Sequence, residues 1–260
     1  MSDCSVPTAG ARPLHGTVGD GCPLSVVMPV FNEEAVIDDV LAEVAQEVLA
    51  LVPGSELVVI DDCSTDGTSA ALARAAAADP RIRVITNPVN AGHGVSVRRG
   101  FDAASGDWIF QIDSDGQVDL AQFGGLWAQR ERSDLLMGVR VVRHDPRHRL
   151  VLTRITRLIV SLLARRRLHD ANVPFKLMRA DLVHHLAPFV PADAFAPSIL
   201  FALGAARSGA RLTEVEIRHL PRPHGESTLR VWRLARACLR SGWQTLRFSL
   251  RRLPPFQPEP

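Results

Sequence analysis

Three acidic segments of this chain each follow a short apolar run that is typical of a β-strand. The runs and their acidic segments are Leu24–Met28 with Asn32-Glu33-Glu34, Leu57–Ile60 with Asp61-Asp62, and Trp108–Ile112 with Asp113-Ser114-Asp115. Carboxylates that converge at one edge of a sheet repel one another unless cations or hydrogen-bond donors lie between them. A divalent metal that bridges a diphosphate removes this repulsion, because hard oxygen ligands suit Mg²⁺ and Mn²⁺. The pattern therefore predicts a site for a metal and a diphosphate.

Each acidic segment also has a simpler interpretation. Asn32-Glu33-Glu34 could merely cap a helix, Asp66-Gly67 could be only a turn, and an isolated Asp-x-Asp is usually a solvated loop. The conjunction of three acidic strand ends, in order and within one alternating domain, favours a functional site over these interpretations.

Strands and helices are predicted to alternate through the first 140 residues. Further strands are expected at Ile82–Ile85 and Leu135–Val139, and helices at 36–49, Thr68–Ala78, Gly94–Ala104 and Leu120–Gln129. This alternation predicts an α/β fold with a mostly parallel sheet and helices on both faces. Ligands of such sheets bind beyond the carboxyl ends of the strands, which is where the three acidic segments stand.

The second half of the chain changes character. Its predicted elements are a basic amphipathic helix at Leu150–Ala164, a turn and short helix within 172–190, a helix at Ser198–Arg207, a strand at Leu212–Ile217 and a long amphipathic helix at Arg230–Arg251. Acids concentrate before Asp134, whereas the stretch from Arg140 to Arg167 is rich in arginine. The first half therefore suits cations and the second half anions.

Composition sets the expected domain limits and location. Residues 1–22 lack the apolar run of a signal peptide and are expected to form a disordered leader. Residues 23–228 would form the main α/β domain, with 150–167 as an amphipathic helix for an acceptor or a membrane, and 229–260 a basic amphipathic helix and Pro-rich tail. No segment reaches the ~20 apolar residues of a membrane span, and the four cysteines lack metal-ligand spacing. We expect a cytoplasmic protein whose membrane contact is peripheral.

The acidic segments, together with the glycine-containing segment Asn90–Gly94, resemble the successive motifs of family 2 glycosyltransferases with a GT-A fold. The matching segments are Val26–Glu34, Val58–Thr68, Asn90–Gly94 with Gly100, and Ile112–Gln117, followed by Gly138–Arg140, Asp170–Arg179 and Glu214–Ser227. The later segments resemble dolichyl- and polyprenyl-phosphate sugar transferases. The resemblance implies inverting transfer from a nucleotide-diphosphate sugar, GDP-mannose or a UDP-hexose, to a polyprenyl phosphate with Mg²⁺ or Mn²⁺.

The resemblance also implies residues for the donor pocket. Pro29, Phe31 and Glu33 would line the nucleotide, and Asp61 and Asp62 would hold its base or ribose. Phe31 stands where a tyrosine is common in the family, which removes a hydroxyl group but keeps the aromatic face.

A second set of implied residues would hold the metal and the phosphates. Asp113, Asp115 and Gln117 would bind the metal and the donor diphosphate, with Ser114 beside the donor. His93, between two glycines, is expected to be a loop residue near the pocket rather than a base.

Residues on the acceptor side follow from the later segments. Arg140 and Arg222 would face phosphates, although an arginine is most often a surface residue in a chain of this composition. Asp170 could act as a general base on a hydroxyl acceptor, but with an anionic lipid phosphate it would instead position a metal, sugar or loop. Its simpler interpretation is a turn residue after a helix. Thr228 stands where the lipid-phosphate enzymes usually have lysine.

The two amphipathic helices suggest an anionic membrane surface as a partner. Apolar stripes usually pack into a core, but arginines beside both stripes are typical of an interfacial helix. Nucleic acid is not expected, because no nucleic-acid-binding motif accompanies the basic residues. Two rival functions are transfer to a glycan or glycolipid hydroxyl and non-catalytic binding of a nucleotide sugar.

Overall fold

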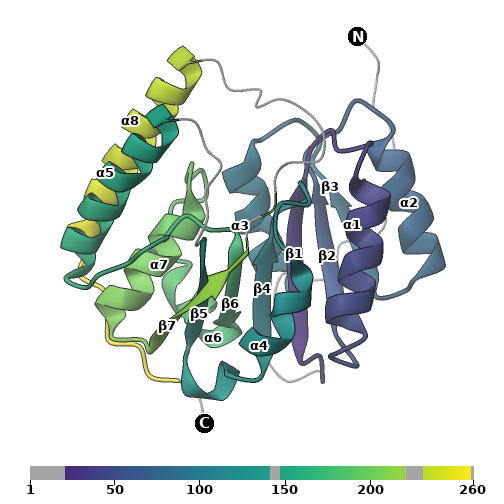
Figure 1. Cartoon of the computed structure of the whole chain (residues 1–260), viewed down its shortest axis with the longest axis horizontal. Coiled ribbons are helices and arrows are strands. Elements are labelled where there is room, and N and C mark those ends of the chain that lie inside the picture. Colours follow the sequence, from purple (N-terminus) through teal and green to yellow (C-terminus); the bar gives the residue numbers. More distant parts are fainter. Residues whose placement is uncertain (1–20, 141–146, 219, 221–230, 259–260) are drawn as a thin grey trace.

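A seven-stranded sheet in the order β3-β2-β1-β4-β6-β5-β7 forms the centre of the computed structural model (Figure 1). The structure describes residues 21–140, 147–218, 220 and 231–258. The strands are β1 Leu24–Val30, β2 Glu56–Asp61, β3 Ile82–Thr86, β4 Trp108–Ile112, β5 Leu135–Arg140, β6 Phe175–Arg179 and β7 Leu212–Ile217. Only β6 runs against its neighbours β4 and β5. The expected mostly parallel α/β sheet is confirmed.

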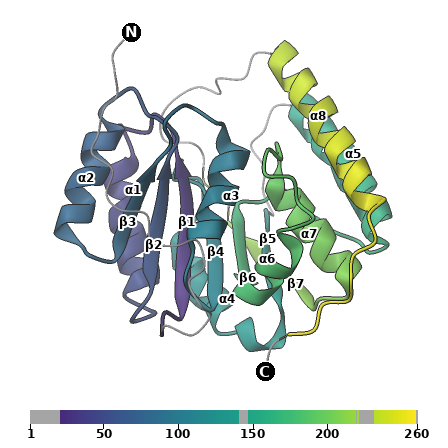
Figure 2. The same ribbon diagram turned by 180° about the vertical axis from the view of Figure 1, so that it is seen from behind.

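Helices cover both faces of the sheet, as expected. One face carries α1 Ile37–Val44, α2 Thr68–Ala78 and α4 Phe123–Trp127, and the other carries α3 His93–Ala103, α6 Ala180–Leu186 and α7 Pro197–Ser208 (Figures 1 and 2). A π-helical turn, Ala45–Leu49, extends α1, and 3-10 turns form at Leu120–Gln122 and Arg130–Arg132. Beyond α7, the long helices α5 Arg147–Ala164 and α8 Val231–Ser249 lie side by side.

The central strands are apolar because helices bury both of their faces. Every residue of β1 and of β4 is buried, which is typical of parallel strands covered on two sides. In the edge strand β3, by contrast, Ile82 is buried and the four residues after it are partly or fully exposed. The sheet order reverses between β1 and β4, so loops diverge there and leave space for a ligand.

The structure corrects two sequence expectations. The segment 172–190, predicted to be a turn and a short helix, begins with the strand β6. Lys176 and the preceding Pro174 interrupt the apolar run, so the short strand has no clear sequence signal. The helix predicted over Leu120–Gln129 is broken into a 3-10 turn and the five-residue α4, in keeping with the low helix propensity of glycine.

A glycine sets the approach of α3 to the sheet. A Cβ atom at Gly100 would lie 2.3 Å from Cγ1 of Val27 on β1. No side chain fits at that separation unless the helix or the side chain of Val27 shifts. Gly125 on α4 offers a contrast, because a Cβ atom there would meet nothing within 4 Å.

We therefore predict that alanine has opposite effects at these two glycines. Gly100→Ala should lower the free energy of unfolding by about 1–3 kcal/mol through overpacking. Gly125→Ala should raise it by about 0.5–1 kcal/mol, because alanine loses less backbone entropy in a helix. Urea denaturation of both variants measures the difference. Equal effects would contradict the close packing of α3 on β1.

Candidate active site

The carboxyl ends of β1, β2 and β4 bring the predicted acidic segments to one edge of the sheet. Pro29 is buried within β1 and lies opposite Ile60 of β2, while Phe31 follows the strand with 43% of its surface exposed. Asn32 then adopts a φ of 54° and binds the β2 loop: its side-chain amide oxygen accepts a 2.8 Å hydrogen bond from the amide of Thr65. The backbone of Glu33 donates to Oγ1 of Thr68 at 2.9 Å. The first two loops are therefore locked together.

Asp61 and Asp62 are buried and shape the loops around the proposed donor pocket. Asp61, the last residue of β2, accepts hydrogen bonds from the backbone of Ser64 at 3.0 Å and from Oγ of Ser69 at 2.5 Å. Asp62 accepts from the side chain of Asn87 at 2.6 Å. It also accepts from the backbone amides of Ala91 and Gly92.

These contacts assign each carboxylate a position. Asp61 fixes the loop that leads into α2, and Asp62 fixes the turn that leads into α3. Each carboxylate is stabilised by several donors, as buried charges require. Sequence reasoning expected them to touch base or ribose, and no contact in the structure tests that role.

His93 links the α3 side of the site to Asp113. The histidine is the first residue of α3, and its Nε2 lies 2.9 Å from Oδ1 of Asp113. Packing disfavours the charged imidazolium, but the nearby carboxylates outweigh it and raise the pKa of His93 above its ordinary value. Sequence reasoning placed this histidine near the pocket but did not predict the contact with Asp113.

The Asp-x-Asp segment forms a tight turn after β4. Oδ1 of Asp115 accepts a 3.1 Å hydrogen bond from the backbone of Gln117, and Gly116 adopts a φ of 65° between them. Ser114 is buried, whereas Asp113 keeps 28% of its side chain exposed. The carbonyl of Gln117 accepts from the backbone of Leu220 at 2.8 Å, which ties the turn to the chain after β7.

The acidic edge fits a metal ion whose coordination is completed by oxygens of the substrate. Among the described residues, no cluster of three or more His, Cys, Asp or Glu side chains is arranged to hold an ion. Mg²⁺ that serves phosphorylated substrates usually takes one or two carboxylates from the protein and further oxygens from the phosphates. Asp113 and Asp115 supply that number of carboxylates.

Arg140 and Asp170, far apart in the sequence, form a nearly buried ion pair. Arg140 is the last residue of β5, and its Nε and Nη2 donate to the two carboxylate oxygens of Asp170 at 2.7 and 3.0 Å. The side chains are 13% and 5% exposed. This two-bond geometry holds the guanidinium plane in a fixed orientation. Arg222, predicted to face a phosphate, lies outside the described residues.

Lys176 is a buried cation that sequence reasoning did not select. It is the only lysine of the chain, lies on β6 and has no exposed surface. Its Nζ donates to the carbonyl of Val173. Burial lowers the pKa of Lys176 to about 7, although the charges of Asp170 and Asp113 oppose that shift. The sequence marks this residue only as the single lysine of the chain. Its position in the sheet could not be inferred, because the strand β6 was not predicted.

The outer faces of α5 and α8 expose large apolar side chains. On α5 these are Ile155, Leu158, Ile159 and Leu162, and on α8 they are Leu239, Trp243 and Leu246, with Leu250 directly after the helix; their exposed fractions run from 45% to 78%. The described parts of the predicted stripes therefore do not pack into the core of the chain. Leu152 and Trp232, also predicted to belong to them, lie outside the residues whose side chains the structure describes.

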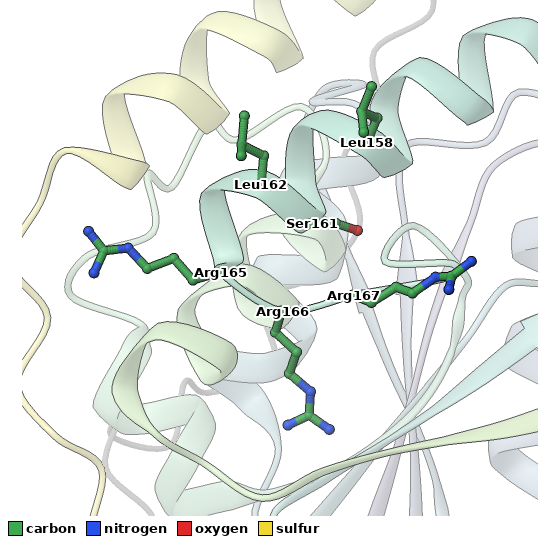
Figure 3. Close-up of a pocket in the computed structure, with 6 residues that line it drawn as sticks. All are labelled: Leu158, Ser161, Leu162, Arg165, Arg166 and Arg167. Atoms are coloured by element: carbon green, nitrogen blue, oxygen red, sulfur yellow. The ribbon is translucent and has the colours of Figure 1, made fainter.

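A basic depression lies at the C-terminal end of α5 (Figure 3). Leu158, Ser161 and Leu162 line it together with the consecutive residues Arg165, Arg166 and Arg167. Arg166 donates to the carbonyl of Leu212, the first residue of β7. The depression is therefore at the opposite end of the sheet from the acidic edge and belongs to the outer helical surface. No helix among the described residues has the length and apolar character of a membrane span.

Known proteins resemble the chain in sequence. Dodecaprenyl-phosphate galacturonate synthase of Rhizobium johnstonii is 28% identical over 237 residues, which cover 88% of this chain and 68% of the relative. Undecaprenyl-phosphate 4-deoxy-4-formamido-L-arabinose transferase of Pseudomonas aeruginosa is 29% identical over 214 residues, which cover 81% and 61%. The matched region thus spans 68% and 61% of the length of these two curated relatives.

Known structures share the fold. Glucosyl-3-phosphoglycerate synthase from Mycobacterium tuberculosis, in complex with Mn²⁺, UDP and phosphoglyceric acid, superposes with a TM-score of 0.67 at 21% identity, covering 93% of this chain and 85% of that chain. The fold is therefore that of the GT-A glycosyltransferases, as the sequence predicted. A sequence profile described as glycosyl transferase family 2 matches residues 25–186. This match extends over more than half of the sequence, and the chain belongs to glycosyl transferase family 2.

Proposed function

We propose that the chain transfers a sugar from a nucleotide-diphosphate sugar to a polyprenyl phosphate, with inversion at the anomeric carbon. The observation that carries the proposal is that Asp113 and Asp115 share one edge of the sheet with the Arg140–Asp170 pair. One side of the edge suits a metal diphosphate and the other an anionic acceptor. The relatives named as dodecaprenyl- and undecaprenyl-phosphate enzymes support this acceptor class.

The donor would lie where the sheet order reverses, beside the locked β1 and β2 loops. Phe31 offers an exposed aromatic face there, and aromatic faces stack on nucleotide bases. Pro29, Glu33, Asp61 and Asp62 would shape the pocket around base and ribose. UDP in the mycobacterial structure of the same fold supports a nucleotide donor.

Asp113 and Asp115 would bind Mg²⁺ or Mn²⁺ together with the donor diphosphate, and Gln117 and Ser114 would complete the surroundings. The metal would neutralise the charge that develops on the departing diphosphate. The Mn²⁺ in the mycobacterial complex supports this cofactor class. His93 contacts one oxygen of Asp113 and so restrains that carboxylate.

The acceptor side needs orientation more than proton transfer. A lipid phosphate is anionic near neutral pH, so its oxygen attacks the anomeric carbon without a general base. Arg140 would face that phosphate, and both oxygens of Asp170 engage the guanidinium group of Arg140. Asp170 therefore acts as an orienting carboxylate in this proposal. Arg222 is proposed as a further phosphate contact from its sequence alone.

We also propose that α5 and α8 adsorb the protein to the cytoplasmic face of an anionic membrane. A polyprenyl phosphate stays in the bilayer, so the active site must approach it. The exposed apolar residues on the two helices lie near arginines, among them the exposed Arg154, Arg157 and Arg165. Apolar insertion and attraction to anionic headgroups, about 1 kcal/mol for each arginine, would together give reversible binding.

The metal role predicts the effect of a change at Asp115. Asp115→Asn keeps the shape of the side chain but removes its charge, and should lower sugar transfer by about 100-fold or more, since several kcal/mol of charge stabilisation is lost. Release of nucleotide diphosphate with and without added polyprenyl phosphate measures the effect. Asp119→Asn is the matched control, because Asp119 caps the 3-10 turn Leu120–Gln122 and is not part of the proposed metal site.

Three outcomes would separate the rival functions. Full activity of Asp115→Asn in EDTA would contradict the metal role. Release that depends on a glycan and not on the lipid phosphate would favour a hydroxyl acceptor. Donor binding without any release would favour a non-catalytic binding protein.

The membrane role predicts binding in a flotation assay. The protein should float with liposomes that contain anionic lipid and dissociate at high salt, where charges are screened. Changing Arg154, Arg157 and Arg165 to glutamine should reduce flotation strongly. The matched control changes Arg74, Arg81 and Arg132 to glutamine, since these lie outside α5 and α8. Protein that stays in the soluble fraction with every lipid composition contradicts the membrane role.

A further inference from the structure

Lys176 occupies a position in the sheet that a lysine rarely takes. Its Cα pairs with Gln111 of β4 on one side and Met137 of β5 on the other, and no part of the residue reaches solvent. Burial of an ammonium group is unfavourable, and lysine is almost never fully buried without a partner. A neutral side chain of similar volume would fit this core at lower cost. The charge therefore calls for an explanation beyond packing.

The surroundings of Lys176 connect it to the acceptor side of the site. Its ammonium group donates to the carbonyl of Val173, and the amide of Val173 donates to the carbonyl of Asp170 at 3.1 Å. The lysine thereby holds the short loop that carries the carboxylate of Asp170. That carboxylate in turn fixes the guanidinium group of Arg140 with two hydrogen bonds.

Arg140, Asp170 and Lys176 also set the local charge. Arg140 and Lys176 are cationic and Asp170 is anionic, so the cluster carries one excess positive charge when the lysine is protonated. Asp113 at the end of β4 is the further charged group that acts on the lysine. An excess positive charge in a region of low dielectric attracts an anion strongly.

We propose that Lys176 is a positioning residue for the acceptor, which fixes the loop of Asp170, and through it Arg140, in the arrangement that receives the acceptor phosphate. This inference rests on the proposed function. Lys176 is buried and does not touch the substrate itself. Its effect is on the orientation of Arg140 and on the potential at the acceptor position.

The test compares two variants of the full chain. Lys176→Met removes the charge at nearly constant volume, and Lys176→Arg keeps it. Initial rates of sugar transfer are measured at increasing concentrations of polyprenyl phosphate in detergent. Binding of nucleotide diphosphate is measured separately, by calorimetry with Mn²⁺. We expect Lys176→Met to raise the acceptor KM about tenfold or more, as for a lost charge-assisted hydrogen bond. Nucleotide affinity should change less than about twofold, and Lys176→Arg should restore most of the acceptor KM.

A pH series provides a readout that a purely structural role would not change. Burial lowers the pKa of Lys176 to about 7, so the lysine is charged below that pH and neutral above it. The acceptor KM of the unaltered protein should therefore rise as pH increases through about 7. The acceptor KM of Lys176→Met should lack this rise, because methionine has no titratable group. Comparison with the variant removes contributions from His93 and from the lipid phosphate.

A matched control separates this role from general stability. Arg211→Met breaks the ion pair with the buried Asp134, 2.7 Å long, at the opposite edge of the sheet. It should lower the thermal midpoint without changing the acceptor KM. Lys176→Met with an unchanged acceptor KM, or with equal losses in acceptor use and nucleotide binding, overturns the inference. An unaltered protein that binds the nucleotide but transfers nothing to polyprenyl phosphate instead overturns the proposed function.

Discussion

The convergence of carboxylates at the edge where the sheet order reverses is the constraint on which the other features of the site depend. Like charges cannot gather there unless each has its own stabilising partner. Hydroxyl and amide donors surround Asp61, the backbone amides before α3 surround Asp62, and an imidazole holds Asp113. The loops have their shapes because they supply these partners. The folding of the loops therefore offsets the electrostatic repulsion, and the proposed cation would offset it further.

The fold could be predicted to the extent that its elements have local signals. The bounds of Thr68–Ala78, Trp108–Ile112 and Leu212–Ile217 agree between sequence and structure. Gly67 and Asp79 mark the ends of the helix, and Asp107 and Asp113 mark those of the strand Trp108–Ile112. The strand β6 could not be predicted, since a lysine interrupts its short apolar run. Antiparallel insertion between two parallel strands also leaves no periodic trace in the sequence.

The residues of the candidate site could likewise be predicted only where they have a local signal in the sequence. Asp61 ends a strand and Asp113 directly follows one, so both could be selected because the end of a strand is visible in the sequence, whereas Arg140 could be selected from the family resemblance. Their partners could not. The contact of Asp62 with Gly92 joins positions 30 residues apart, and so does the pair of Arg140 with Asp170. Such contacts depend on three-dimensional loop paths, and the pairing of Lys176 with Val173 further requires the strand that the sequence conceals.

The ion pair between Arg140 and Asp170 has a consequence for how this architecture varies. The chain leaves the sheet at Arg140, forms α5 and reaches Asp170 shortly before it re-enters the sheet at Phe175, so the pair joins both ends of a segment that contains the exposed helix. The ion pair thereby separates this segment from the sheet. Insertions, deletions or exchanges within α5 would alter the surface that the protein presents to its surroundings while the two anchor points stay together. The same sheet could thus carry different outer helices without a change at its carboxyl edge.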